Sequence, residues 1–179
     1  MKYDLTSPLR DEDIKKLRAG DQVTVTGIIY TARDAAHKRL CELIAKGEKL
    51  PLDLEGQIIY YAGPTPEKPG CVIGSIGPTT SGRMDPYAPI LMKDCGLKGI
   101  IGKGQRNMAV REAIKENICV YMAATGGAGA LLRKHITACE TVAYPDLGCE
   151  AIRKLTVDHL PVIVINDCEG NDFYRKDKI

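Results

Sequence analysis

The chain has 179 residues and a formal net charge of +2 at pH 7, with 44% hydrophobic and 27% charged residues. This composition excludes an intrinsically disordered chain and a strongly basic nucleic-acid binder, so no nucleic-acid partner is expected. A chain of this length buries roughly 70% of the surface that its unfolded form exposes, so folding needs no disulfide or metal. We therefore predict a single domain over residues 1–179.

Cysteines are frequent but scattered, at positions 41, 71, 95, 119, 139, 149 and 168. Their odd number and the absence of any C-x-x-C pair fit neither a disulfide framework nor a zinc site. An iron–sulfur cluster held wholly by this chain would need clustered thiolates, which the sequence lacks. We expect the cysteines to act as small buried hydrophobes, with no metal bound by this chain.

The sequence predicts neither a signal peptide nor a membrane span, because it opens on polar residues and contains no apolar run near 18 residues. A cytoplasmic location without membrane contact is therefore expected. A reducing cytosol would keep the thiols free.

The first half of the chain alternates extended and helical patterns. Gly20 and Gly47 mark the ends of two helices, and Thr31 to Asp34 has the spacing of a capping box before the second helix. The expected elements are a helix at 10–20, a strand at 22–30, a helix at 31–47, and strands at 57–62 and 71–76 around a turn-rich loop at 63–70.

The same alternation continues in the second half. The expected elements are a helical stretch from 84 to about 95, a strand at 98–102, a helix at 107–116, a strand at 118–123, a Gly-rich turn at 126–133 leading into a short helix, and strands at 136–144, 151–157 and 160–166. This order favours an α/β fold with a mixed or double sheet over a purely parallel one.

Three cations each follow a predicted strand, near the start of a helix: Arg33, Arg83 and Lys103. A cation in the first turn of a helix faces the positive end of the helix dipole, which is unfavourable by roughly 0.3–1 kcal/mol unless an anion lies between them. The carboxyl ends of strands in α/β sheets are also where anionic ligands bind. The pattern indicates an anion site, although solvated surface cations or a local ion pair, such as Arg83 with Asp85, would give the same spacing.

The loop from Gly77 to Arg83 reads GPTTSGR, with three consecutive hydroxyl side chains between glycines. Glycines let the backbone approach a ligand closely, so the loop is a candidate anion-binding segment. It is not a P-loop, because Arg83 and Met84 replace the required Lys and Ser/Thr. The alternative is a hydroxyl turn that caps the next helix.

Two further patterns point less clearly to chemistry. The segment TGGAGAL at 125–131 follows a strand but lacks the G-x-G-x-x-G spacing, so helix packing is preferred to dinucleotide binding. The histidines His37, His135 and His159 have no metal-ligand spacing. His37 lies nearest to a candidate residue, Arg33, and is interpreted as a capped or solvent-facing helix histidine.

Four segments together resemble the β subunit of class I, iron–sulfur-dependent fumarate hydratase, a family that also includes the β subunit of L-tartrate dehydratase. They are TARDAAHKR at 31–39, GPTTSGRMD at 77–85, GKGQR at 102–106 and LPVIVINDCEGNDFY at 160–174. The resemblance runs nearly from end to end. It implies a three-layer swivelling β/β/α domain with mixed parallel and antiparallel sheets.

The resemblance also implies a 4Fe-4S cluster held by three cysteines of a separate α subunit, with an α2β2 assembly. The implied activity is the reversible hydration of fumarate to L-malate. Residue by residue, Arg33, Arg83 and Lys103 match carboxylate-binding cations, Thr79 matches the threonine proposed as base for the C3 proton, and Thr80 matches its neighbour in the substrate pocket.

Two rival functions stay open. One is a sister hydro-lyase acting on L-tartrate or another dicarboxylate, because one methyl or hydroxyl group in a pocket decides such specificity. The other is a non-catalytic regulatory subunit that binds a dicarboxylate.

Overall fold

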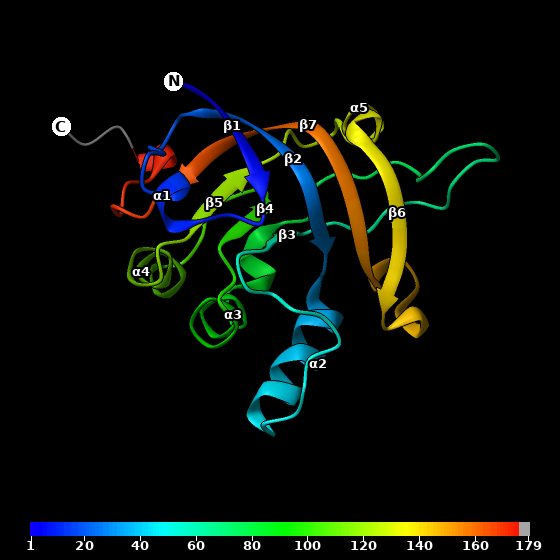
Figure 1. Ribbon diagram of the computed structural model, residues 1–179, viewed down its shortest axis with the longest axis horizontal. Coiled ribbons are helices and arrows are strands. Elements are labelled where there is room, and N and C mark those ends of the chain that lie inside the picture. Colours follow the sequence, from blue (N-terminus) through cyan, green and yellow to red (C-terminus); the bar gives the residue numbers. More distant parts are fainter. Residues whose placement is uncertain (176–179) are drawn as a thin grey trace.

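The computed structural model describes residues 1–175, and its helices and strands alternate along most of the chain (Figure 1). The strands are β1 (Lys2–Ser7), β2 (Gln22–Thr31), β3 (Ile58–Tyr60), β4 (Gly99–Gly102), β5 (Val120–Ala123), β6 (Ile136–Ala143) and β7 (Ile152–Asn166). The α-helices are α1 (Asp11–Ile14), α2 (Asp34–Ala45), α3 (Ala88–Cys95), α4 (Met108–Glu116) and α5 (Gly129–Leu132). Short 3-10 helices are η1 (Ser81–Met84), η2 (Arg133–His135), η3 (Pro145–Glu150) and η4 (Phe173–Arg175).

The strands form one mixed sheet that closes on itself. Strands β1 to β5 are parallel to their neighbours, and β7 is antiparallel to both β2 and β5. Because β7 pairs at both ends of this series, β2, β3, β4, β5 and β7 make a closed, barrel-like ring, with β6 antiparallel on β7. The prediction of a mixed α/β fold is confirmed, while the three-layer swivelling description and the single domain over 1–179 stay predictions.

Two apolar clusters lie on opposite faces of the strands. Ile58 and Tyr60 of β3 pack in one cluster with side chains of β2, β4, β5 and β7 across the ring. The intervening Ile59 and the following Tyr61 pack in the second cluster against α2, α3 and α4, the helices grouped below the ring in Figure 1. The period of two along each strand therefore divides the aliphatic residues between the ring interior and the helix layer.

Most predicted elements are confirmed, with four differences. Strand β1 was not predicted, because only Leu5 and Ser7 are buried in it and the charged residues Lys2 and Asp4 precede them. The helix expected at 10–20 is confined to Asp11–Ile14. The segment 71–76 is not a strand; Ile73 and Ile76 are apolar because they pack in the core under the loop.

The two strands expected at 151–157 and 160–166 are one strand, β7. The apparent break is a β-bulge, where Asp158 and His159 lie opposite Thr26 of β2 and the pairing shifts register. His159 adopts a left-handed backbone (φ 48°), and its N–H donates to Thr26 Oγ1 at 3.1 Å. A bulge adds one unpaired residue without ending the strand, so the polar pair interrupted the strand pattern in the sequence but not the strand itself.

The cysteines are all free. Cys119 and Cys168 are buried, Cys149 is exposed, and the other four are partly exposed. Burial raises the pKa of the Cys119 thiol well above its usual range, as expected for a packed and unreactive thiol. In the described part of the chain, no helix is both long and apolar enough to cross a bilayer.

Candidate functional site

The predicted site residues lie at the carboxyl ends of the parallel strands. Arg33 follows β2, Lys103 follows β4, and the loop with Thr79 and Thr80 crosses the end of β3. The Thr79 N–H donates to the Tyr61 carbonyl at 2.6 Å, and Thr80 forms a parallel bridge with Lys103. These pairings place the threonine loop between the ends of β3 and β4, at the edge where α/β sheets bind ligands.

Arg33 occupies the N-cap position of α2. Its backbone is extended there and no side chain caps the helix, so the predicted capping box is wrong. Thr31 is instead the last residue of β2 and accepts a hydrogen bond from the Arg153 N–H at 3.1 Å. The Arg33 side chain packs against Gly63, where a Cβ would lie 3.0 Å from Arg33 Nη1, and its Nε lies 3.7 Å from Glu150 Oε1.

Arg83 lies in η1, and its side chain is half exposed. Its Nε donates to Asp34 Oδ1 at 2.9 Å, so the suggested local pair between Arg83 and Asp85 is wrong. Asp34 is the first residue of α2, next to Arg33. The ion pair therefore connects η1 to the start of α2 and brings both arginines to the same end of the sheet.

The threonine loop is fixed by Ser81, which is fully buried. Ser81 Oγ accepts the Lys103 N–H at 3.1 Å, and the Ser81 N–H donates to the Lys103 carbonyl at 2.9 Å. The Tyr121 hydroxyl lies 2.9 Å from Ser81 Oγ and donates to the Gly104 carbonyl at 2.7 Å. Thr80 makes no side-chain capping bond to η1, so the alternative of a hydroxyl turn capping the next helix is wrong.

The Lys103 side chain is exposed while its backbone is held on both sides by Ser81. The Gly-rich turn after β5 passes beside it, since a Cβ on Gly126 would lie 3.8 Å from Lys103 Cδ. The turn that resembled a dinucleotide motif therefore borders this site.

Arg106, to which the sequence analysis gave no role, is buried behind the threonine loop. Its Nε donates to Asp85 Oδ1 at 2.6 Å, and its guanidinium lies 4.9 Å from the Tyr121 ring centroid and 5.3 Å from that of Tyr61. Asp85 also accepts the N–H of Asn107, the N-cap of α4, at 2.8 Å. In the sequence this ion pair is visible only as an aspartate in the segment 77–85 and an arginine in the segment 102–106, and nothing there links the two.

His37 is fully buried, so the prediction of a solvent-facing histidine is wrong. Burial lowers its pKa to about 4, so the imidazole is neutral at pH 7. The ring makes an edge contact with Tyr61, with centroids 5.1 Å apart.

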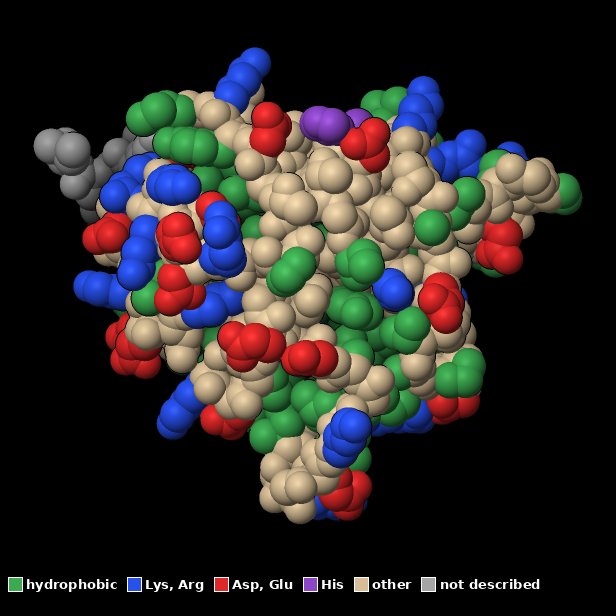
Figure 2. Space-filling model, in the orientation of Figure 1, with side chains coloured by type: hydrophobic (Ala, Val, Ile, Leu, Met, Phe, Trp, Pro, Cys, Tyr) green, Lys and Arg blue, Asp and Glu red, His purple; other side chains and the backbone are tan. Residues whose placement is uncertain are grey.

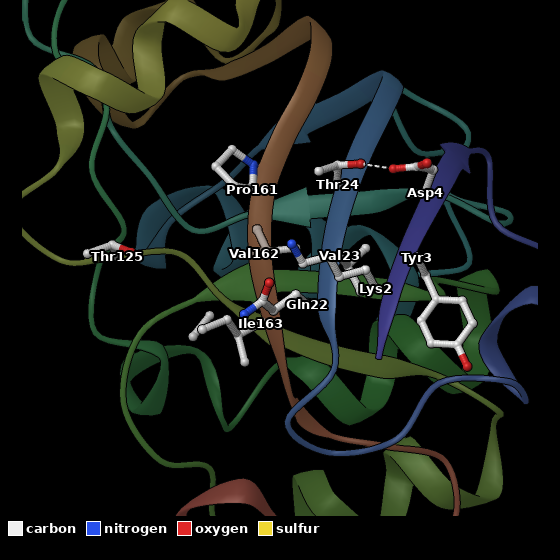
Figure 3. A pocket seen from close by; sticks show the side chains of 11 residues that line it. Lys2, Tyr3, Asp4, Gln22, Val23, Thr24, Thr125, Pro161, Val162 and Ile163 are labelled. Atoms are coloured by element: carbon white, nitrogen blue, oxygen red, sulfur yellow. Dashed lines mark hydrogen bonds between the residues drawn. The ribbon is translucent and has the colours of Figure 1, made fainter.

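A separate cavity of about 460 Å³ lies beside β1, β2 and β7 (Figure 3). None of the five predicted site residues lines it. Asp4 and Thr24 face each other there through a hydrogen bond, and Thr125 approaches from the turn after β5. The surface over β2 and β7 is largely uncharged, with charged side chains gathered at its flanks (Figure 2). The lining of this cavity therefore differs in chemistry from the sheet edge that carries Arg33, Arg83 and Lys103, which we call the cationic edge.

Over residues 1–175 no three His, Cys, Asp or Glu side chains gather as a metal site. The cationic edge instead offers two guanidiniums, an ammonium and two hydroxyls, groups that bind and orient carboxylates.

Several known proteins are similar in sequence to this chain. The chain is 37% identical over 179 residues to the anaerobic class I fumarate hydratase of Escherichia coli (strain K12), covering 98% of this chain and 33% of that protein. It is 36% identical to fumarate hydratase 2 of Leishmania major, and the match covers 98% of this chain and 32% of that protein. The chain thus spans about a third of the length of these enzymes.

A relative of similar length comes from Methanocaldococcus jannaschii. It bears the provisional name L(+)-tartrate dehydratase subunit beta, and is 40% identical over 173 residues, covering 94% of this chain and 89% of that protein. Residues 1–177 also match the family described as Fumarase C-terminus. The chain therefore belongs to the Fumarase C-terminus family, as a β-type domain of the class I fumarate hydratase group.

Proposed function

We propose that this chain is the β subunit of an iron–sulfur-dependent hydro-lyase that reversibly hydrates fumarate to L-malate together with a cluster-bearing α subunit. The observation that supports it most is the grouping of Arg33, Arg83 and Lys103 around Thr79 and Thr80 at one sheet edge. Fumarate and malate are dianions, and such a grouping of cations suits a dicarboxylate.

The two arginines would bind a substrate carboxylate. A guanidinium presents paired N–H donors that match the two oxygens of a carboxylate, and two such forks fix the orientation of the carbon chain. Lys103 would act later in the reaction. Its ammonium would offset the extra negative charge that develops on a carboxylate when the neighbouring carbon loses its proton.

Thr79 would receive the proton from C3 of malate. A hydroxyl is a weak base, so its own proton must pass to a stronger acceptor. The family resemblance assigns that acceptor to an aspartate of the α subunit. The Thr79 backbone is held by its bond to the Tyr61 carbonyl, so its side chain approaches the substrate from a fixed position.

The thiols of this chain do not fit a cluster. Cys119 is buried and donates to the Leu97 carbonyl at 3.1 Å, and Cys149 is the one exposed cysteine among the seven. We therefore assign the 4Fe-4S cluster to the α subunit. The open surface of Thr80, Arg83 and Lys103 suits a half-site that this partner completes, in the α2β2 assembly implied by the family.

L-Tartrate is the second candidate substrate. The relative from Methanocaldococcus jannaschii, whose length matches this chain, is named for tartrate dehydration. The kcat/KM values of the assembled enzyme for L-malate and L-tartrate decide between them, because one hydroxyl group in the pocket is worth about 10-fold or more.

The function is tested by expressing the chain anaerobically, alone and with a cluster-bearing α subunit. We expect the complex to interconvert malate and fumarate and the isolated chain to be inactive. Activity of the isolated chain, or an inactive complex with an intact cluster, would contradict the proposal.

A second experiment separates a catalytic from a regulatory role. Thr79→Ala should abolish turnover in the complex while dicarboxylate binding persists, whereas Thr137→Ala, an exposed threonine on β6, should change neither. Unchanged turnover in Thr79→Ala would favour the non-catalytic dicarboxylate-binding role.

A further inference from the structure

Both arginines of the proposed carboxylate clamp face a carboxylate through the same atom. Arg83 Nε donates to Asp34 Oδ1 at 2.9 Å, and Arg33 Nε lies 3.7 Å from Glu150 Oε1. Over residues 1–175, the terminal nitrogens of Arg83 and of Arg33 make no side-chain hydrogen bond, and the closest approach to each carboxylate is through Nε. Each guanidinium thus has its Nε side occupied and its Nη1–Nη2 fork free.

We propose that Asp34 and Glu150 are positioning residues that hold the two guanidiniums by Nε, so that both forks point to a substrate carboxylate. The inference rests on the proposed function, because it assigns the forks to that substrate. A guanidinium has two donor edges suited to carboxylates, and occupying the Nε edge leaves the end-on fork for the ligand. Without such a contact, a long arginine side chain samples many rotamers.

The two carboxylates act in different ways. Asp34 makes a hydrogen bond of 2.9 Å to Arg83, and as the first residue of α2 it lies at the positive end of the helix dipole. Glu150 is too far from Arg33 for a hydrogen bond, and both facing atoms are buried without a hydrogen-bond partner. Its effect is therefore the attraction of opposite charges, which burial strengthens.

This difference predicts distinct behaviour of the conservative variants. Asp34→Asn retains a carbonyl oxygen that can accept the Arg83 Nε–H, so it should restore most of what Asp34→Ala loses. Glu150→Gln removes the charge that attracts Arg33, so it should be as impaired as Glu150→Ala.

The test measures KM and kcat for malate, and inhibition by the unreactive dicarboxylate succinate, in the assembled enzyme. Asp34→Ala should raise KM and the succinate inhibition constant about 10- to 100-fold, the value of a hydrogen bond to a charged group. The fall in kcat should be smaller, because carboxylate binding is shared by ground and transition states. KM and the succinate inhibition constant should also rise for Glu150→Ala, in this case because the charge attraction on Arg33 is lost.

A double-mutant cycle separates positioning from a general structural effect. In an Arg83→Ala background, Asp34→Ala should cause no further rise in KM, and Glu150→Ala should likewise cause none in an Arg33→Ala background. Asp146→Ala is the matched control, because Asp146 binds Arg39 of α2 at 2.9 Å through an exposed pair outside the clamp. It should leave KM unchanged.

Thermal unfolding shows whether each variant is folded, and Tm should stay within about 4 °C of the parent. The proposal is overturned if Asp34→Ala leaves KM unchanged while Arg83→Ala raises it, or if the two effects multiply. An Arg83→Ala variant with unchanged KM would overturn the proposed function itself, and this inference with it.

Discussion

The imidazole of His37 is joined to the backbone carbonyl of Arg33 by a hydrogen bond of 2.8 Å. A carbonyl accepts only, so Nδ1 bears the hydrogen and Nε2 is the unprotonated nitrogen of a neutral ring. Nε2 is buried without a hydrogen-bond partner. The histidine therefore holds the start of α2, and the backbone of a proposed substrate-binding residue, in its neutral form.

Acid should weaken the fold through His37. Its folded pKa of about 4 lies below the 6.5 of an ordinary histidine, so between these values the unfolded chain binds the extra proton. The contribution of His37 to the free energy of unfolding is therefore fully present above pH 6.5. It is lost as pH falls toward 4, and the total loss is about 3 kcal/mol. Urea denaturation at pH 7 and pH 4.5 measures the loss, and His37→Asn should reduce it.

The matched control is His159→Asn, because the His159 side chain is 66% exposed and asparagine tolerates its left-handed backbone. That variant should keep the pH dependence of the parent. If His37→Asn and the parent lose equal free energy of unfolding between pH 7 and pH 4.5, His37 is not the group that causes the acid sensitivity.

Asp85 should be essential to folding. The Arg106 side chain has no exposed surface, so Asp85→Ala would leave a buried guanidinium without its counter-charge and remove the acceptor of the Asn107 N–H. We expect a loss of about 3–5 kcal/mol in the free energy of unfolding, measured by urea denaturation. Asp146→Ala, which removes the carboxylate of the exposed Arg39 pair, should have little effect. A similarly small effect for Asp85→Ala would contradict the buried ion pair.

Gly102 should tolerate no side chain. An added Cβ would lie 2.0 Å from Ser81 Oγ, and Ser81 cannot move freely because three hydrogen bonds hold it. Gly102→Ala should cost about 1–3 kcal/mol. Gly77→Ala, whose Cβ would make only ordinary contacts with Gly129, to Cα at 3.8 Å and to N at 3.9 Å, should be nearly neutral.

The close contact with Ser81 can be tested directly. Ser81→Ala removes the clashing oxygen, so Gly102→Ala and Ser81→Ala together should cost less than the sum of the two single changes, as measured by denaturation. Strict additivity would show that the added Cβ acts elsewhere.

The repeating pattern of the chain predicted most of the fold. The helix expected to end at Gly47 ends at Ala45, and Gly47 follows it in a left-handed conformation (φ 68°). This end was predicted closely because a glycine that stops a helix acts only on the neighbouring residues. The closure of the ring could not be predicted, since it depends on β7 pairing with β2 and β5 from distant parts of the sequence. The gap between the strands expected at 151–157 and 160–166 could not be recognised as a bulge for the same reason.

The candidate site was likewise only partly predictable from the sequence. Arg33, Arg83 and Lys103 were singled out because each follows a predicted strand, although the segment 71–76 before Arg83 is not a strand. Their counter-charges were not, because Asp34 and Glu150 come from different segments that only the folded sheet brings together. His37 was misplaced since helical spacing alone does not show that Tyr61 covers it.

Lys103 should affect the rate of the proposed reaction more than substrate binding. Its backbone N–H and carbonyl are both held by Ser81 and its side chain is exposed, so Lys103→Gln removes the ammonium without disturbing the fold. If the ammonium stabilises charge that develops only in the transition state, kcat for malate should fall about 100- to 1000-fold with little change in KM. For Arg83→Gln we expect the reverse, a larger change in KM than in kcat, because this variant removes binding that the ground and transition states share. Steady-state kinetics of the assembled enzyme distinguish the two, and a rise in KM alone for Lys103→Gln would place Lys103 with the carboxylate-binding arginines.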